Sequence, residues 1–207
     1  MKVFLRTFGC RANHYDTEAV RAMLDAAGHS VAVTAATGDE GWGHLRYPAA
    51  SPYVTAVGGT DIDIFDGSEE AWLDSGSGCS PYEPQPPWQA ALPELATACS
   101  GRAGADVSFL ADGMSVYDSA GFLGRTGWMD GAGTSVATPA IAAIYALAGN
   151  AATVVDGSYP YEHRDALFDV TQPQGAASPS CTSAVCEPGP GWDGPTGLGA
   201  PRGIGGF

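Results

Sequence analysis

The stretch GTSVATP, Gly133 to Pro139, places a serine between a glycine turn and the start of a long apolar segment. That segment, residues 136–150, closes with Gly149 and so predicts a buried helix that ends on a glycine. Backbone N–H groups without helical partners, and the positive end of the helix dipole, would then lie beside Ser135 and favour negative charge developing there. Ser135 is therefore a candidate nucleophile, although a serine at this position also serves as a plain helix N-cap.

The composition is that of one globular domain. The chain has 207 residues, of which 44% are hydrophobic and 15% charged, which is ordinary for a protein with its own core. It has 9 basic and 23 acidic residues and a net charge of -14, which argues against a nucleic-acid partner. No stretch reaches the roughly 18 apolar residues of a membrane span, and the first residues lack the apolar core of a secretion signal. We expect no membrane partner.

The order of the expected elements favours an α/β fold. Apolar residues at helical spacing predict a helix over 16–27, followed by a strand over 30–36. Residues 53–59 predict a second buried strand, and 105–109 and 116–117 predict others. Strands that alternate with a long helix indicate a parallel sheet with helices on both faces.

Four of the five cysteines form two local pairs, Cys79 with Cys99 and Cys181 with Cys186. Both pairs lie in glycine- and proline-rich segments, where a covalent link has most to stabilise, so we expect two disulfides and an oxidising compartment. Four reduced structural cysteines are the alternative. Neither pair has CxxC spacing, which disfavours zinc.

Two further segments set GTSVATP in a family context. They are TAATGDEGWG, residues 34–43, and YPAASPYVTAVGGT, residues 47–60. Together with the GTSxAxP signature, they resemble the oxyanion loop and nucleophile of the subtilisin and sedolisin peptidases. Subtilisins carry an asparagine at the position of Asp39, whereas sedolisins, the serine-carboxyl peptidases, carry an aspartate. An aspartate donates a hydrogen bond to an oxyanion only when it is protonated, which suits acidic conditions. Taken alone, TGDEG would be an ordinary turn.

The histidines also favour the sedolisin type. The chain has four of them, His14, His29, His44 and His163. None stands in the HGT-like context of a subtilisin base. The resemblance to sedolisins covers about residues 31–207 and is closest to bacterial secreted members. It implies an α/β, subtilisin-like three-layer fold with a mainly parallel sheet, truncated at its N-terminal side, with Ser135 as nucleophile and Asp39 as oxyanion partner.

The C-terminal part resembles the sedolisin calcium loop. The similarity lies in LFDVT, residues 167–171, and PGWDGPTGLGAP, residues 190–201. It implies one Ca²⁺ ion bound by two carboxylates and three main-chain carbonyls, those of Asp169, Asp193, Val170, Gly189 and Gly191. An all-oxygen set of this kind suits a hard cation. The alternative is a glycine-rich turn with solvated aspartates.

Sedolisins activate their serine with a glutamate and an aspartate four residues apart on an upstream helix, and this chain has no such pair. The expected helix over 16–27 offers Asp16, Glu18 and Asp25. Glu18 and Asp25 would lie about 10 Å apart along the helix axis, too far to act on one serine. We expect solvated charges there, and weak or absent activity. Omitted upstream strands would also expose a sheet edge, which favours self-association.

The first thirty residues resemble a different family. MKVFLRTFGCRANHYDTEAVRAMLDAAGH is similar to the start of a radical tRNA methylthiotransferase, in which the cysteine corresponding to Cys10 helps to bind an iron–sulfur cluster. One cysteine cannot hold a cluster, and no CxxxCxxC motif follows. We expect residues 1–30 to be a helical segment rather than a domain, joined to a peptidase-like part over 31–207.

The sequence therefore predicts a serine-type endopeptidase of sedolisin type that prefers acidic pH and acts on peptides or proteins. The alternative is a non-catalytic, calcium-stabilised binding or scaffold module derived from a peptidase. The resemblance and the cysteine pairs indicate an extracellular location.

Overall fold

The computed structural model describes residues 5–7, 22–24, 26–28, 31–43, 45–121, 124–175, 181 and 183–207. Much of the helix expected over 16–27 lies outside these ranges, but residues 22–24 and 26 are helical. Of the N-terminal residues singled out above, Cys10, Asp16, Glu18 and Asp25 lie outside the described part, as do His14, His29 and His44. In the described part of the chain, no helix is long and apolar enough to cross a membrane.

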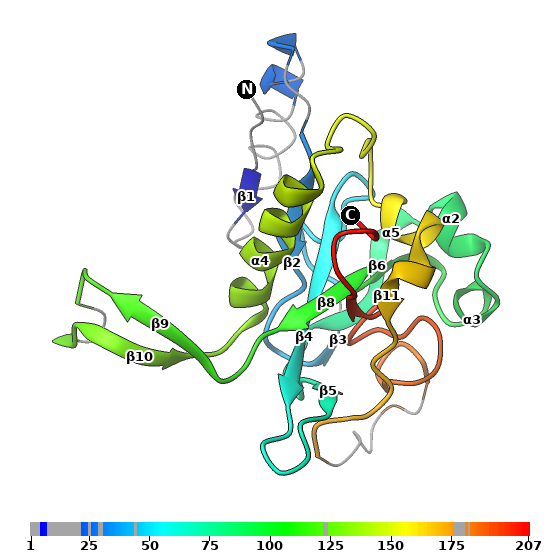
Figure 1. Cartoon of the computed structure of the whole chain (residues 1–207). Coiled ribbons are helices and arrows are strands. Elements are labelled where there is room, and N and C mark those ends of the chain that lie inside the picture. The colour runs from blue at the N-terminus through cyan, green and yellow to red at the C-terminus, as the bar shows by residue number, and fades with distance from the viewer. Residues whose placement is uncertain are drawn as a thin grey trace.

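A mainly parallel sheet forms the centre of the molecule (Figure 1). Strand β4 (Thr55–Ile62) runs parallel to β2 (Val33–Ala36) and to β8 (Val107–Leu110). On the far side of β2, β1 (Leu5–Thr7) adds another parallel strand, and β5 (Glu69–Ala71) pairs antiparallel with the end of β4. The expectation of a mainly parallel sheet is confirmed, and the predicted strands at 30–36, 53–59 and 105–109 are found with shifted ends.

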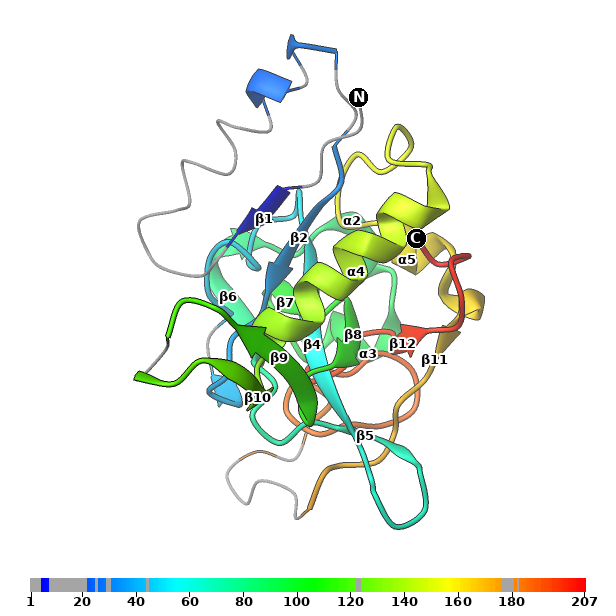
Figure 2. The same cartoon turned by 60° about the vertical axis from the view of Figure 1, so that its left-hand side comes forward.

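Helix α4 (Thr134–Ala148) crosses one face of this sheet and packs on β2, β4 and β8 (Figure 2). Its fully buried residues include Ala137, Ile141 and Tyr145, which recur at helical spacing along one stripe. As predicted, the helix ends on Gly149, which adopts a left-handed φ of 76°. The expectation of a helix buried on all sides is wrong, because only one stripe meets the sheet and Leu147 is 74% exposed.

The two faces of the sheet are covered differently. Along β2, alternate side chains point to opposite faces, and the Thr34 hydroxyl donates to the Thr138 carbonyl of α4 at 3.3 Å. Val33 and Ala35 instead join a separate apolar cluster with Leu45, Ala49, Ala50, Val54 and Ala56. Within the described residues, this second face is covered mainly by the irregular segment 45–54, and the predicted helical cover is limited to Leu24 of the helical residues 22–24.

A smaller sheet lies beside the main one. It consists of β3 (Trp42–Gly43), β6 (Ser77–Pro84) and β7 (Gly101–Gly104). Between β6 and β7 run the short helices α2 (Pro87–Ala90) and α3 (Pro93–Ala96). The predicted disulfide between Cys79 and Cys99 is present and joins β6 to the residues just before β7.

The remaining elements surround this core. Strand β9 (Met114–Asp118) forms an antiparallel hairpin with β10 (Gly127–Gly131), and this hairpin projects from the body in Figure 1. After α4, the chain forms α5 (Tyr159–Glu162), a 3-10 turn (Arg164–Ala166) and β11 (Leu167–Phe168). Strand β11 pairs with β12 (Ala200–Pro201), which places the C-terminal loop against the body.

A buried ion pair joins the two sheets. Arg102 of β7 and Asp106, just before β8, are both completely buried, and the guanidinium donates to both carboxylate oxygens. The Tyr161 hydroxyl donates to Asp106 at 2.7 Å, and the Ala56 amide of β4 does so at the same distance. Burial acts most strongly on Arg102 and lowers its pKa, but the charges of Asp106 and Tyr161 and the hydrogen bonds to them together outweigh burial, and the pKa is raised.

Candidate active site

Ser135 lies in the first turn of α4 and is exposed. The residue two positions earlier, Gly133, has a φ of 136°, a backbone conformation that residues with a side chain rarely adopt. The Gly133 amide donates to the Ala111 carbonyl at 2.7 Å, which ties the start of the helix to the residue after β8. The GTS turn therefore presents the serine at a helix N-terminus, as the sequence predicts.

Asp39 reaches the same place from the carboxyl end of β2. The Thr37 amide donates to the Val57 carbonyl at 3.0 Å and so extends the pairing of β2 with β4 up to the turn. Beyond it, the Gly76 amide donates to the Gly38 carbonyl at 2.8 Å. A side chain at position 76 would meet the Gly38 carbonyl oxygen at 2.7 Å, so the two backbone segments approach more closely than any other residue would permit.

One carboxylate oxygen of Asp39 closes the N-terminus of α4. Asp39 Oδ1 accepts a hydrogen bond from the Thr134 amide at 2.7 Å and lies 2.9 Å from the Thr134 hydroxyl. The N-cap residue Gly133 has no side chain for this task, so the cap comes from a residue 95 positions earlier in the chain. Capping leaves the second carboxylate oxygen, Oδ2, for other contacts.

Asp39 Oδ2 and Ser135 Oγ both lie close to Gly133. A Cβ atom built on Gly133 would stand 3.0 Å from Ser135 Oγ and 3.1 Å from Asp39 Oδ2. Both oxygens therefore border the same small space, which only a glycine leaves open. The structure thus brings together the two residues that the sequence selected as nucleophile and oxyanion partner.

Sequence reasoning missed Thr134. It is fully buried, and its hydroxyl accepts a hydrogen bond from the Gly38 amide at 3.2 Å while lying near Asp39. Its position in the motif, directly before Ser135, is the only local signal that could have drawn attention to it. Thr134 holds the Asp39 turn and the serine helix together.

The residues expected to bind calcium also lie close together. The Gly191 amide donates to Asp169 at 2.8 Å, and the Gly189 amide donates to Asp193 at 3.0 Å. The Val170 carbonyl is 3.4 Å from the Thr196 hydroxyl, which is also 2.9 Å from Asp193. Gly189 and Gly191 therefore contact the two carboxylates through their backbone N–H groups, not through the carbonyl groups that were expected as ligands. In addition, a Glu94 oxygen lies 3.3 Å from the Trp192 amide, a neighbour that the sequence did not suggest.

The chemistry of this loop suits a hard cation. Asp193 is completely buried, and burial raises its pKa to about 7, against the opposing effect of hydrogen bonds from Gly189 and Thr196. The nearby charge of Asp169 raises the pKa further. Among the described residues, no three His, Cys, Asp or Glu side chains could hold a metal by themselves. A cation here would need main-chain oxygens as well, which is the all-oxygen type of site that Ca²⁺ takes.

The second predicted disulfide, Cys181 with Cys186, is present and lies at the start of the same loop. The Gly194 amide donates to the Ala184 carbonyl at 2.6 Å, so the disulfide-closed turn is bonded to the segment that carries Asp193. His163, the one histidine in the described part, stacks on Tyr159 and lies 2.9 Å from the Tyr159 carbonyl through Nδ1. Its contacts are those of a structural residue.

Comparison with known sequences connects these features to peptidases. Residues 5–175 match the model of the subtilase family. Kumamolisin of Bacillus sp. (strain MN-32) is 35% identical over 209 residues, which cover 89% of this chain and 37% of that protein. Tripeptidyl-peptidase 1 of Homo sapiens is 31% identical over 218 residues, 87% of this chain and 37% of that protein. The chain therefore spans little more than a third of these relatives.

Solved structures show the same fold. Pseudomonas sedolisin, a serine-carboxyl proteinase complexed with two molecules of pseudo-iodotyrostatin, superposes with a TM-score of 0.66 at 23% identity, covering 97% of this chain and 62% of that one. Sphericase superposes with a TM-score of 0.61 at 19% identity, over 97% of this chain and 57% of that one. These matches establish a subtilisin-like α/β fold, of which this chain forms a part.

Proposed function

The chain belongs to the subtilase family and is of the sedolisin type, and we propose that it forms the serine-bearing part of a serine-type endopeptidase. The observation that carries this proposal is that Ser135 Oγ and Asp39 Oδ2 both lie close to Gly133, at the N-terminus of α4. A helix N-terminus and a hydrogen-bond donor beside an exposed serine stabilise the oxyanion that forms during acyl transfer.

In the proposed reaction, Ser135 Oγ gives its proton to a base or to water and attacks the peptide carbonyl carbon. The C–N bond then breaks and the amine leaves with a proton, and water later hydrolyses the acyl-enzyme to release the carboxylic acid and restore the Ser135 hydroxyl. The carbonyl oxygen becomes an oxyanion beside Asp39. Asp39 Oδ1 already accepts hydrogen bonds from Thr134, so Oδ2 is the oxygen that would donate to the oxyanion when the carboxyl is protonated. A protonated carboxyl is most populated in acid, which supports an acidic pH preference.

We propose that turnover by this chain alone is weak or absent. A serine hydroxyl needs a base to accept its proton, and no glutamate before Asp39 has an aspartate four residues later. The chain also spans only 37% of the length of its relatives kumamolisin and tripeptidyl-peptidase 1.

For the C-terminal loop, we propose one Ca²⁺ ion, held by the carboxylates of Asp169 and Asp193 and by the carbonyls of Val170, Gly189 and Gly191. The ion would neutralise two neighbouring carboxylates and stabilise the loop. The two disulfides support an extracellular location. The strand at the end of the main sheet, β1, has one edge without a partner among the described strands, and self-association through this edge is part of the proposal.

A fluorophosphonate probe tests the central proposal, because it forms a covalent bond with an activated serine. We expect slow labelling near pH 4 that disappears in Ser135→Ala and falls in Asp39→Ala. The matched control is Ser158→Ala, since Ser158 lies away from the site at the start of α5. Labelling that survives in Ser135→Ala would overturn the proposal. No labelling of the unmodified chain would favour the non-catalytic, calcium-stabilised binding module.

A further inference from the structure

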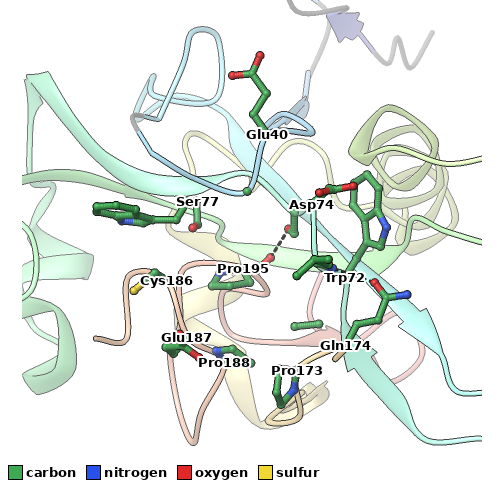
Figure 3. A pocket seen from close by; sticks show the side chains of 15 residues that line it. Glu40, Trp72, Asp74, Ser77, Pro173, Gln174, Cys186, Glu187, Pro188 and Pro195 are labelled. Carbon is green, nitrogen blue, oxygen red and sulfur yellow. Dashed lines mark hydrogen bonds between the residues drawn. The ribbon is translucent and has the colours of Figure 1, made fainter. Parts of the chain in front are cut away.

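A second candidate site lies on the other side of the Asp39 turn. A cavity of about 310 Å³ begins at Glu40, the residue directly after Asp39. Its walls come from four parts of the chain: the turn after Asp39, the segment from the end of β5 to the start of β6, residues 173–174, and the C-terminal loop with its disulfide (Figure 3). In the figure, Ser77, Cys186 and Glu187 lie on one side of the cavity, and Trp72 and Gln174 on the other.

The cavity has a negative lining. Glu40, Asp74 and Glu187 all border it, and none of the described residues that line it is a lysine, arginine or histidine. Glu40 forms an exposed ion pair with Arg46, and its side chain points away from the cavity in Figure 3. Within the described chain, Asp74 and Glu187 have no basic partner. The whole chain carries a net charge of -14, so its overall field also favours a cationic ligand.

Two polar atoms at the cavity are buried without a hydrogen-bond partner in the described chain. They are Ser77 Oγ and Glu187 Oε1, and Ser77 is only 3% exposed. The Ser77 hydroxyl points toward the cavity in Figure 3. Leaving a buried polar atom unsatisfied costs about 1–3 kcal/mol, and more for a charged group, so a donor entering from the cavity would recover that energy.

The rest of the lining suits a long aliphatic stem with a cationic end. Trp42 and Trp72 supply indole rings, and Pro173, Pro188 and Pro195 supply apolar walls. Indole faces attract ammonium and guanidinium groups, and apolar walls cover the methylene stem of lysine or arginine. A neutral apolar side chain would leave Glu187 and Ser77 unsatisfied.

We propose that this cavity binds the lysine or arginine side chain of a peptide, with Glu187 and Ser77 as acceptors and the two tryptophans as packing surfaces. The inference rests on the proposed function, because it assigns a basic residue of the substrate to a position beside Asp39. It adds a preference for peptides with a basic residue, which the positions of Ser135 and Asp39 do not by themselves predict.

Binding is measured by calorimetry with N-acetyl-lysine N-methylamide as the probe and N-acetyl-norleucine N-methylamide as its uncharged counterpart. We expect the lysine probe alone to bind, with affinity that falls as salt rises. Glu187→Gln, which keeps the shape of the side chain, should weaken binding by about tenfold or more, the effect of removing a charged acceptor. Ser77→Ala should weaken it less, and Glu70→Gln, outside the cavity, should leave it unchanged.

Equal binding of the two probes, no binding of the lysine probe, or wild-type affinity in Glu187→Gln would each overturn the inference. Ser135→Ala separates this result from the proposed function, because it removes the nucleophile but leaves the cavity intact. If the lysine probe binds Ser135→Ala normally while the fluorophosphonate fails on the unmodified chain, the cavity assignment holds and the peptidase proposal is wrong. Serine labelling without probe binding gives the opposite conclusion.

Discussion

Thr134 contacts one oxygen of Asp39 twice, through its backbone amide at 2.7 Å and its hydroxyl at 2.9 Å. These contacts join the turn after β2 to the first residue of the serine helix. They orient the carboxyl group so that its other oxygen lies near Gly133 and Ser135. Thr134 therefore acts as a positioning residue for Asp39.

Thr134→Val should loosen this link, because valine keeps the shape of threonine but has no hydroxyl. The Gly38 amide then loses its acceptor, and we expect a loss of about 1–2 kcal/mol in the free energy of unfolding, measured with urea. The rate of fluorophosphonate labelling at Ser135 should fall as well. Thr134→Ser retains the hydroxyl and should restore most of that rate. If valine and serine label equally fast, the positioning role is wrong.

Gly133→Ala should disturb the site directly. An alanine Cβ would lie about 3 Å from both Ser135 Oγ and Asp39 Oδ2, on a backbone with a φ of 136°. Gly127→Ala is the matched control, since Gly127 has a φ of 112° with no atom within 4 Å of the added Cβ. Both variants should lose about 1–3 kcal/mol through backbone strain, but only Gly133→Ala should abolish labelling of Ser135. If labelling is lost in both variants, global destabilisation explains the loss, and the proposed local effect of Gly133→Ala is wrong.

Arg102→Met should be severely destabilising, because it leaves the completely buried carboxylate of Asp106 without its guanidinium partner. The expected loss is about 3–5 kcal/mol in the free energy of unfolding. Arg46→Met breaks the pair with Glu40, whose side chains are 68% and 69% exposed, and should cost less than about 1 kcal/mol. Chemical denaturation of both variants gives the comparison. Similar losses would show that burial does not decide the strength of these pairs.

Calcium should raise the melting temperature, and a chelator should lower it, because an ion that binds only the folded state stabilises it by mass action. Asp193→Asn should remove this dependence, since it takes away a carboxylate of the proposed site. Asp130→Asn, on the exposed face of β10, should respond to calcium as the unmodified chain does. A melting temperature that is independent of calcium in the unmodified chain would contradict the proposed ion.

Features that depend on near neighbours in the chain were predictable. The helix after GTS and its glycine end, the three parallel strands and the two disulfides all follow from local spacing and composition, and the structure confirms them. The apolar sequence of α4 did not reveal that Leu147 would be exposed. A hydrophobic sequence shows that a helix can be buried, whereas the position of the sheet determines which side of the helix is buried.

The sequence by itself determined the kinds of groups at the site. These are Ser135 at the start of a helix, the aspartate Asp39 at the position where subtilisins carry an asparagine, and carboxylate and carbonyl oxygens near the C-terminus that suit a cation. The tertiary structure alone decided that Asp39 caps a helix 95 residues away, that Arg102 and Asp106 are buried together, and that Glu187 borders a cavity next to the Asp39 turn. The physical reason is one of range. Helix ends and strand patterns arise from interactions among near neighbours, whereas a shared carboxylate or a buried ion pair exists only after the parallel strands have brought distant turns together.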